Sequence, residues 1–142
     1  MDKIEAIRFH GAKDVRWESV PRVQSIDKNQ VRIRILAAGI CGSDLHVYET
    51  GNYVTKVPVI MGHEFCGEVL EAGQEVESIE PFDHVVGDSR VVCGQCSFCN
   101  ENKYNLCIKL GFLGEVCDGA FAEEIITDFQ SVIKISAKVP ID

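Results

Sequence analysis

The sequence predicts a mainly β domain built from many short strands, with the form of a barrel or a sandwich. Its 142 residues match the size of one domain, since domains most often run to about 100 to 150 residues. Apolar and polar residues alternate along several short segments, as they do in half-buried strands. Stretches with helical periodicity are few, and glycine, proline or aspartate separates the segments, which favours a barrel or a sandwich.

Five strands are predicted, and the clearest covers residues 31–39. Valine and isoleucine side chains there point one way, two arginines point the other way, and a glycine ends the run. The other four expected strands are residues 3–10, 15–20, 65–70 and 122–127. One helical turn is expected at residues 43–48, with Ser43 or Asp44 near its N-terminus, where such residues cap helices.

Composition and charge narrow the class of protein. With 46% hydrophobic and 25% charged residues the chain is typical of globular proteins. Lys and Arg number 14 against 22 Asp and Glu, a net charge of −8, which disfavours binding to nucleic acid or to an anionic membrane. The first residues lack the apolar core of a secretory signal, and the longest apolar stretch, residues 35–41, is too short for a membrane span. We therefore expect a cytoplasmic protein.

Four cysteines mark a segment that lacks the apolar residues needed to fold by itself. Cys93, Cys96, Cys99 and Cys107 follow the pattern C-x2-C-x2-C-x7-C within residues 93–107. This spacing allows a loop to bring four thiolates to one tetrahedral point, which is the closed site that structural zinc prefers. The free energy of metal binding would then order the lobe.

Three other interpretations of the lobe are weaker. Disulfides fit poorly with an unexported chain and with an odd total of 7 cysteines. A redox C-x2-C pair does not explain four sulfurs. In an iron–sulfur ferredoxin run the fourth cysteine follows after three residues and precedes proline, whereas here seven residues intervene and Ile108 follows. In addition, the interpretation as an iron–sulfur electron-transfer protein would explain the lobe but none of the other motifs.

A second group of metal-ligand residues lies at the ends of predicted strands. Cys41 follows the strand at residues 31–39, and His63 and Glu64 precede the strand at residues 65–70. Two or three protein ligands with a position left open suit a catalytic zinc. From spacing alone, a small buried cysteine and a structural histidine remain at least equally good interpretations.

The motifs taken together closely resemble the zinc-dependent medium-chain alcohol and polyol dehydrogenases. They occur in the order of that family and cover essentially the whole chain: Cys-Gly-Ser-Asp-Leu-His at 41–46, Gly-His-Glu-Phe at 62–65, the four-cysteine lobe, and Asp-Gly-Ala-Phe-Ala-Glu at 118–123. The resemblance implies that residues 1–142 form a GroES-like, partly opened β-barrel with short helices and a zinc-binding lobe at about 93–107. In the family, a Rossmann domain that binds NAD or NADP follows.

The resemblance also assigns roles to single residues. Cys41 and His63 match ligands of the catalytic zinc, with Glu64 beside the metal, and the four lobe cysteines match the ligands of the structural zinc. Ser43 matches the hydroxyl that takes the substrate proton, and His46 the outer end of the proton relay. Asp44 matches the carboxylate that orients the zinc-binding histidine.

The expected parent protein oxidises a secondary alcohol of a polyol or sugar acid to a ketone by hydride transfer to NAD or NADP. Relatives are commonly dimers or tetramers, largely through the second domain, so this chain by itself would be monomeric. Because no G-x-G-x-x-G occurs in the 142 residues, we expect no turnover from the chain alone. The alternative is a stand-alone zinc-stabilised interaction module, which gives no reason to keep the catalytic-site residues together.

Smaller features add three expectations. Phe82 precedes Asp83 where relatives usually have glycine, so we expect a turn built without the positive φ that glycine permits. The side chains of Tyr48, Glu49 and Phe112 are candidates for lining the substrate pocket. The remaining two cysteines, Cys66 and Cys117, are expected to be ordinary thiols.

Overall fold

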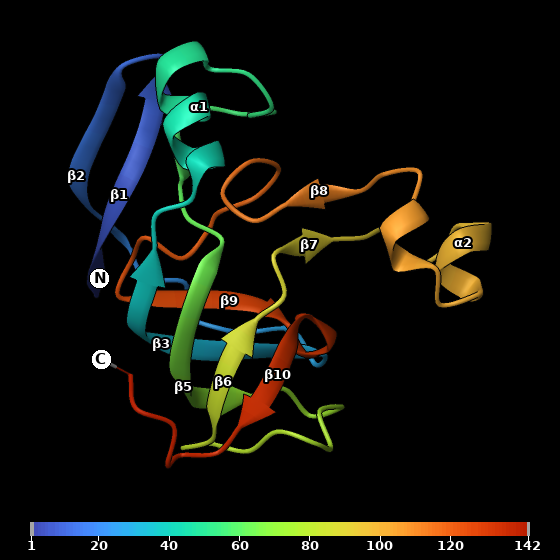
Figure 1. The fold of residues 1–142 in the computed structure, drawn as a ribbon. Coiled ribbons are helices and arrows are strands. Elements are labelled where there is room, and N and C mark those ends of the chain that lie inside the picture. Colours follow the sequence, from blue (N-terminus) through green and yellow to red (C-terminus); the bar gives the residue numbers. More distant parts are fainter. Residues whose placement is uncertain (1, 142) are drawn as a thin grey trace.

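The protein has a mainly β fold with short helices, and the computed structural model describes residues 2–141 (Figure 1). The strands are β1 (Lys3–Gly11), β2 (Asp14–Pro21), β3 (Gln30–Gly39), β4 (Val59–Ile60), β5 (Glu64–Ala72), β6 (His84–Gly87), β7 (Arg90–Val91), β8 (Gly111–Phe112), β9 (Glu124–Asp128) and β10 (Val132–Ile135). The α-helices are α1 (Gly42–Thr50) and α2 (Ser97–Asn100), and the 3-10 helices are η1 (Tyr104–Leu106) and η2 (Phe129–Ser131).

The strands form three open antiparallel sheets. Their orders are β2-β1-β4, β10-β6-β5-β3-β9 and β7-β8. The predicted mainly β, partly opened architecture is therefore confirmed, because these sheets do not close on themselves into a barrel. Within residues 2–141, no helix has the length and apolar character needed to cross a membrane.

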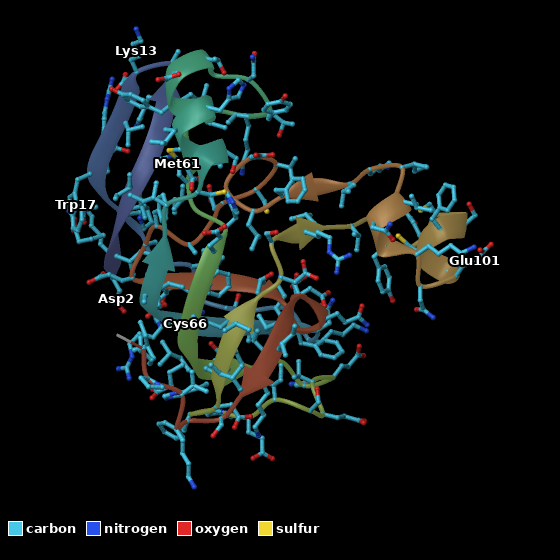
Figure 2. The ribbon with its side chains drawn as sticks, viewed as in Figure 1. Asp2, Lys13, Trp17, Met61, Cys66 and Glu101 are labelled. Carbon is cyan, nitrogen blue, oxygen red and sulfur yellow. The ribbon has the colours of Figure 1, made fainter. Side chains whose placement is uncertain are left out.

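The hairpin of β1 and β2 packs one face on α1. Phe9 is buried against Val47 of α1 and against Val59 and Met61, which form a small apolar cluster. The hairpin turns at Lys13, which has a φ of 65°. Trp17 on β2 points away from this cluster and is 72% exposed, and Figure 2 shows it at the outer edge of the molecule. The two predicted strands are thus confirmed.

The five-stranded sheet holds the main core. Val31 and Ile33 of β3 are fully buried, and they pack with Val69 of β5 and Val85 of β6. The predicted alternation along β3 is confirmed with one difference, because Arg32 on its other face is also buried. Its guanidinium contacts the carboxylates of Glu71 and Glu124 at 3.1 and 3.3 Å. Buried charge needs such partners.

Helix α1 begins at Gly42, separated by two residues from the end of β3, with Cys41 as its N-cap. The Asp44 carboxylate accepts a hydrogen bond of 2.8 Å from the Cys41 N–H, which satisfies one of the free donors at the helix start. The helix ends where Gly51, with a φ of 74°, donates to the carbonyl of Val47. This fixes the distance between Cys41 and the residues of the first turn.

Gly62 sets the path from β4 into β5. Its φ is 91°, and a Cβ atom there would overlap the ring of Phe121. Any side chain would therefore be strained both by its backbone conformation and by its neighbour. The adjoining His63 and Glu64 are held at the beginning of β5 by this close packing.

The lobe projects from the body on the two short strands β7 and β8 (Figure 1). It contains α2 and η1, and Glu101 lies near its outer end in Figure 2. Among residues 93–107, the buried ones are Cys99 and Cys107. The lobe therefore has little apolar packing apart from its cysteines, as its composition predicted.

The turn at Phe82 differs from the expectation. Phe82 keeps a positive φ of 75° and is 80% exposed, so the prediction of a differently built turn was wrong. Hydrogen bonds impose this conformation: the Phe82 N–H donates to the Val69 carbonyl at 2.8 Å, and the Asp83 carboxylate accepts from the Glu80 N–H at 2.9 Å.

Candidate metal centres

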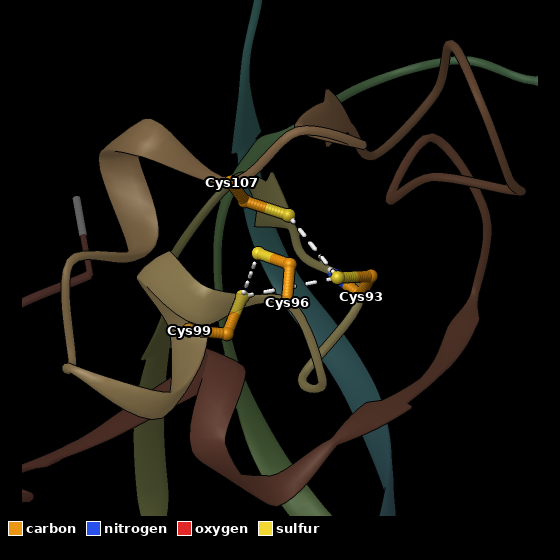
Figure 3. Close-up of side chains that lie close together, drawn as sticks. All are labelled: Cys93, Cys96, Cys99 and Cys107. Atoms are coloured by element: carbon orange, nitrogen blue, oxygen red, sulfur yellow. Dashed lines mark hydrogen bonds between the residues drawn. The ribbon is translucent and has the colours of Figure 1, made fainter.

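The four lobe sulfurs converge on one point (Figure 3). Cys93 Sγ lies 3.5 Å from Cys107 Sγ and 4.0 Å from Cys99 Sγ, and Cys96 Sγ lies 3.5 Å from Cys99 Sγ. Zinc–sulfur bonds of about 2.3 Å in a tetrahedron require sulfurs about 3.8 Å apart. The lobe therefore fits a four-thiolate zinc site, whereas a disulfide requires sulfurs about 2.05 Å apart.

Backbone donors prepare the lobe for thiolates. The N–H groups of Cys93 and Lys109 donate to Cys107 Sγ at 3.3 and 3.4 Å. Hydrogen bonds from the backbone of Cys99 and Ile108 lower the pKa of Cys96 to about 6. Burial acts in the opposite direction and raises the pKa of Cys99 to about 12. A bound dication would favour the thiolate form of this sulfur too.

A second donor group lies where β3 ends and β5 begins. One donor atom each from Cys41, His63 and Glu64 lies within 4.8 Å of the others. The pairing of Gly39 with Glu64 in the sheet brings the two strand ends together, and a Cβ at Gly39 would approach the Glu64 carboxylate to 3.0 Å. Thiolate, imidazole and carboxylate therefore converge as expected, and this donor set suits zinc.

Two neighbours hold the His63 ring. Its Nε2 lies 3.3 Å from the Ser43 hydroxyl, and its Nδ1 lies 3.6 Å from an Asp44 carboxylate oxygen. Asp44 is only 6% exposed and also accepts from the Cys41 N–H. The carboxylate thus faces one ring nitrogen and leaves the other on the side of Ser43, an arrangement typical of metal-binding histidines.

The structure does not bring every predicted site residue into contact. His46 is exposed on α1, and its ring centroid lies 5.6 Å from that of Tyr53. Among residues 2–141, no hydrogen bond joins His46 to Ser43, so the two expected ends of a proton relay are not directly linked.

A cleft of about 430 Å³ opens beside the second donor group. Its lining residues are Ser43, His63, Glu64, Phe65, Gly87, Ser89, Phe112 and Glu115. Of the three residues expected to line a substrate pocket, Phe112 is among these lining residues, whereas Tyr48 and Glu49 are not. Sequence reasoning missed Glu115, a single glutamate in a loop without any motif. Burial raises the pKa of Glu115, an effect that His63 opposes and Asp44 reinforces.

The sequence is similar to those of known dehydrogenases. Residues 27–137 match the family model described as the alcohol dehydrogenase GroES-like domain. The chain is 40% identical over 126 residues to a sorbitol dehydrogenase of Bacillus subtilis, a match that covers 86% of this chain and 35% of the relative. It is 35% identical over 139 residues to an L-threonine 3-dehydrogenase of Bacillus licheniformis, a match that covers 96% of the chain and 40% of the relative.

Solved structures give the same result. A zinc-binding dehydrogenase from Sinorhizobium meliloti bound to NADP superposes with a TM-score of 0.89 at 31% identity, covering 99% of this chain and 40% of that one. Galactitol-1-phosphate dehydrogenase from Escherichia coli gives 0.87 at 29% identity, covering 96% of this chain and 39% of that one. This chain thus spans well under half the length of the proteins that it matches.

Proposed function

Since the chain belongs to the GroES-like domain family of the zinc-dependent medium-chain alcohol and polyol dehydrogenases, we propose that it is the catalytic domain of an NAD- or NADP-dependent enzyme. The proposed reaction oxidises a secondary alcohol of a small polyol to a ketone by hydride transfer. One observation supports this most strongly: a cysteine sulfur, an imidazole and a carboxylate converge, and His63 and Glu64 of this group line a cleft together with Ser43. The four-cysteine lobe is the structural zinc site.

Four residues at or beside the cleft are assigned to binding and orienting the metal. Cys41 and His63 would hold the catalytic zinc, with Glu64 as a third donor. When bound there, zinc acts as a Lewis acid that favours loss of the proton from an alcohol. Asp44 keeps His63 in the required orientation through its contact with Nδ1.

Proton removal is assigned to Ser43 and His46. The Ser43 hydroxyl lies at the cleft wall, 3.3 Å from the imidazole, where it can accept a proton from the substrate hydroxyl. His46 is exposed, so its imidazole can pass a proton to water. Because the two side chains are not directly bonded, a bridging water is proposed between them.

The proposed substrate, cofactor, localisation and oligomeric state are suggested by the relatives. Sorbitol and L-threonine dehydrogenases suggest a small alcohol with a neighbouring polar group, and bound NADP in one solved relative and NADH in another suggest a nicotinamide. We propose a cytoplasmic enzyme that acts as a dimer or tetramer and binds neither nucleic acid nor membrane.

The experiment measures nicotinamide reduction with a secondary diol as substrate. The complete zinc-loaded protein should reduce NAD or NADP, and Ser43→Ala should lower kcat by about 100-fold or more, since proton transfer contributes about 10² to 10⁴ in rate. Residues 1–142 alone should give no turnover, because the hydride acceptor needs a binding site of its own. Ser78→Ala, at an exposed position, is the matched control. Full activity in Ser43→Ala would contradict the proposed role of this hydroxyl.

A further inference from the structure

Glu115 lines the cleft beside the second donor group. It lies in the turn after β8, where its N–H donates to the Phe112 carbonyl at 3.2 Å and its own carbonyl accepts from the Thr55 N–H at 3.0 Å. The backbone is therefore held from two sides while the side chain lines the cleft. Among the residues that the structure describes, no side chain or backbone group donates a hydrogen bond to its carboxylate.

Among the residues that the structure describes, the cleft lining includes no lysine or arginine that could neutralise this carboxylate. Glu64 is a second acid in the same lining. Glu115 is half-buried, so its carboxylate is partly removed from water, and this burial raises its pKa. A partly dehydrated carboxylate without a donor is costly, so a ligand that supplies a donor gains affinity.

We propose that Glu115 is a specificity-determining residue that binds the polar group next to the reacting carbinol, and that the cleft prefers secondary alcohols whose neighbouring group is cationic or neutral. Amino alcohols and diols then bind better than hydroxy acids or phosphate esters. The carboxylate accepts hydrogen bonds from an ammonium or a hydroxyl, and it repels a carboxylate or a phosphate. This inference rests on the proposed function, because it assumes that the cleft takes the substrate.

Three matched probes test the inference without turnover. Propane-1,2-diol, 1-aminopropan-2-ol and lactate share the secondary carbinol and carry a neutral, a cationic and an anionic neighbour. Their dissociation constants are measured by NMR chemical-shift titration of the zinc-loaded chain, for wild type and for Glu115→Gln. The attraction of zinc for a given probe is the same in wild type and in Glu115→Gln. The dissociation constant of each probe is therefore compared between the two proteins, and not with the constants of the other probes.

Glu115→Gln should weaken binding of the amino alcohol by about fivefold or more and tighten binding of lactate, as expected for loss of one charge-assisted contact. The constant for the diol should change by less than about twofold, because a hydrogen bond to an amide replaces one to a carboxylate. Glu77→Gln is the control, since Glu77 is exposed in a loop away from the cleft and the substitution changes the net charge equally.

Equal changes for the three probes, or the same changes in Glu77→Gln, would overturn the inference. The outcome is separate from that of the activity assay. Charge discrimination without nicotinamide reduction by the complete protein leaves Glu115 as a binding residue and refutes the dehydrogenase function, whereas turnover by the complete protein without charge discrimination does the reverse.

Discussion

Asp44 connects the two elements that form the candidate catalytic centre. Its carboxylate fixes the start of α1 by accepting from the Cys41 N–H at 2.8 Å, and it lies 3.6 Å from Nδ1 of His63 at the start of β5. One buried side chain therefore positions residues from both elements. Because a buried carboxylate is costly without partners, this position tolerates few other residues.

Phe82 offers a direct test of backbone strain at one residue. Its φ of 75° is unfavourable for a side chain with a Cβ, and the ring is 80% exposed, so it contributes little packing. Phe82→Gly should raise the free energy of unfolding by about 0.5 to 1 kcal/mol, since left-handed strain of about 1 to 2 kcal/mol is partly offset by the flexibility of glycine in the unfolded chain. Thermal denaturation measures the change.

Phe82→Ala is the control for this substitution. Alanine removes the same exposed ring but keeps the Cβ and hence the strain, so it should not stabilise the protein. A loss of stability in Phe82→Gly would mean that the ring makes contacts that matter more than the backbone conformation.

At the scale of elements, an ion pair ties β10 to the turn before β6. Lys134 Nζ lies 2.7 Å from an Asp83 carboxylate oxygen. The hydrogen bond from Lys134 and a second one from the Glu80 backbone lower the pKa of Asp83 below its ordinary value. A lowered carboxyl pKa contributes stability that is present above the unfolded pKa and lost as pH falls through the folded pKa.

Asp83→Asn should therefore be less stable than wild type near pH 6, and the difference should shrink as the pH falls below about 4. Urea denaturation of both proteins at a series of pH values measures the difference. Lys134→Met removes the same ion pair by deleting the cation. Its difference in stability from wild type should also shrink as the pH falls through the same range. A gap that stays constant with pH would contradict the assignment.

The long strands were predictable from the sequence, but the short ones were not. Strands β1, β2, β3, β5 and β9 were expected, because each is long enough to display alternation. Strands β4, β7 and β8 have two residues each, and β6 and β10 have four. Such segments carry no period of their own, and pairing with longer neighbours stabilises them.

The four lobe cysteines were recognisable because few other structures need their spacing, whereas Cys41 and His63 were identified only through the resemblance to the dehydrogenase family. The conformation of Phe82 in its turn was not predictable, since the hydrogen bond from its N–H to the Val69 carbonyl and the one from the Glu80 N–H to the Asp83 carboxylate impose a conformation that the residue itself disfavours. Glu115 could not be found either, because tertiary contacts with a distant loop place it at the cleft.

At the scale of the whole molecule, the lobe and the cleft share their supports. Strands β7 and β8 carry the lobe, and Arg90 pairs with Phe112 between them. Phe112 and Ser89 beside these strands also line the cleft. Order in the lobe therefore bears on the shape of the cleft, which gives a structural zinc a part in positioning the proposed substrate site.

The zinc content of the purified protein tests the central claim, that this chain has a closed structural site and a separate open catalytic site, most directly. Elemental analysis should find nearly two zinc ions per chain in wild type. Cys99→Ser should lose the lobe zinc only, His63→Ala should lose the other only, and Cys66→Ser, whose thiol belongs to neither donor group, should keep both. A single zinc in wild type, removed by Cys99→Ser and unaffected by His63→Ala, would contradict the catalytic site and favour a zinc-stabilised interaction module.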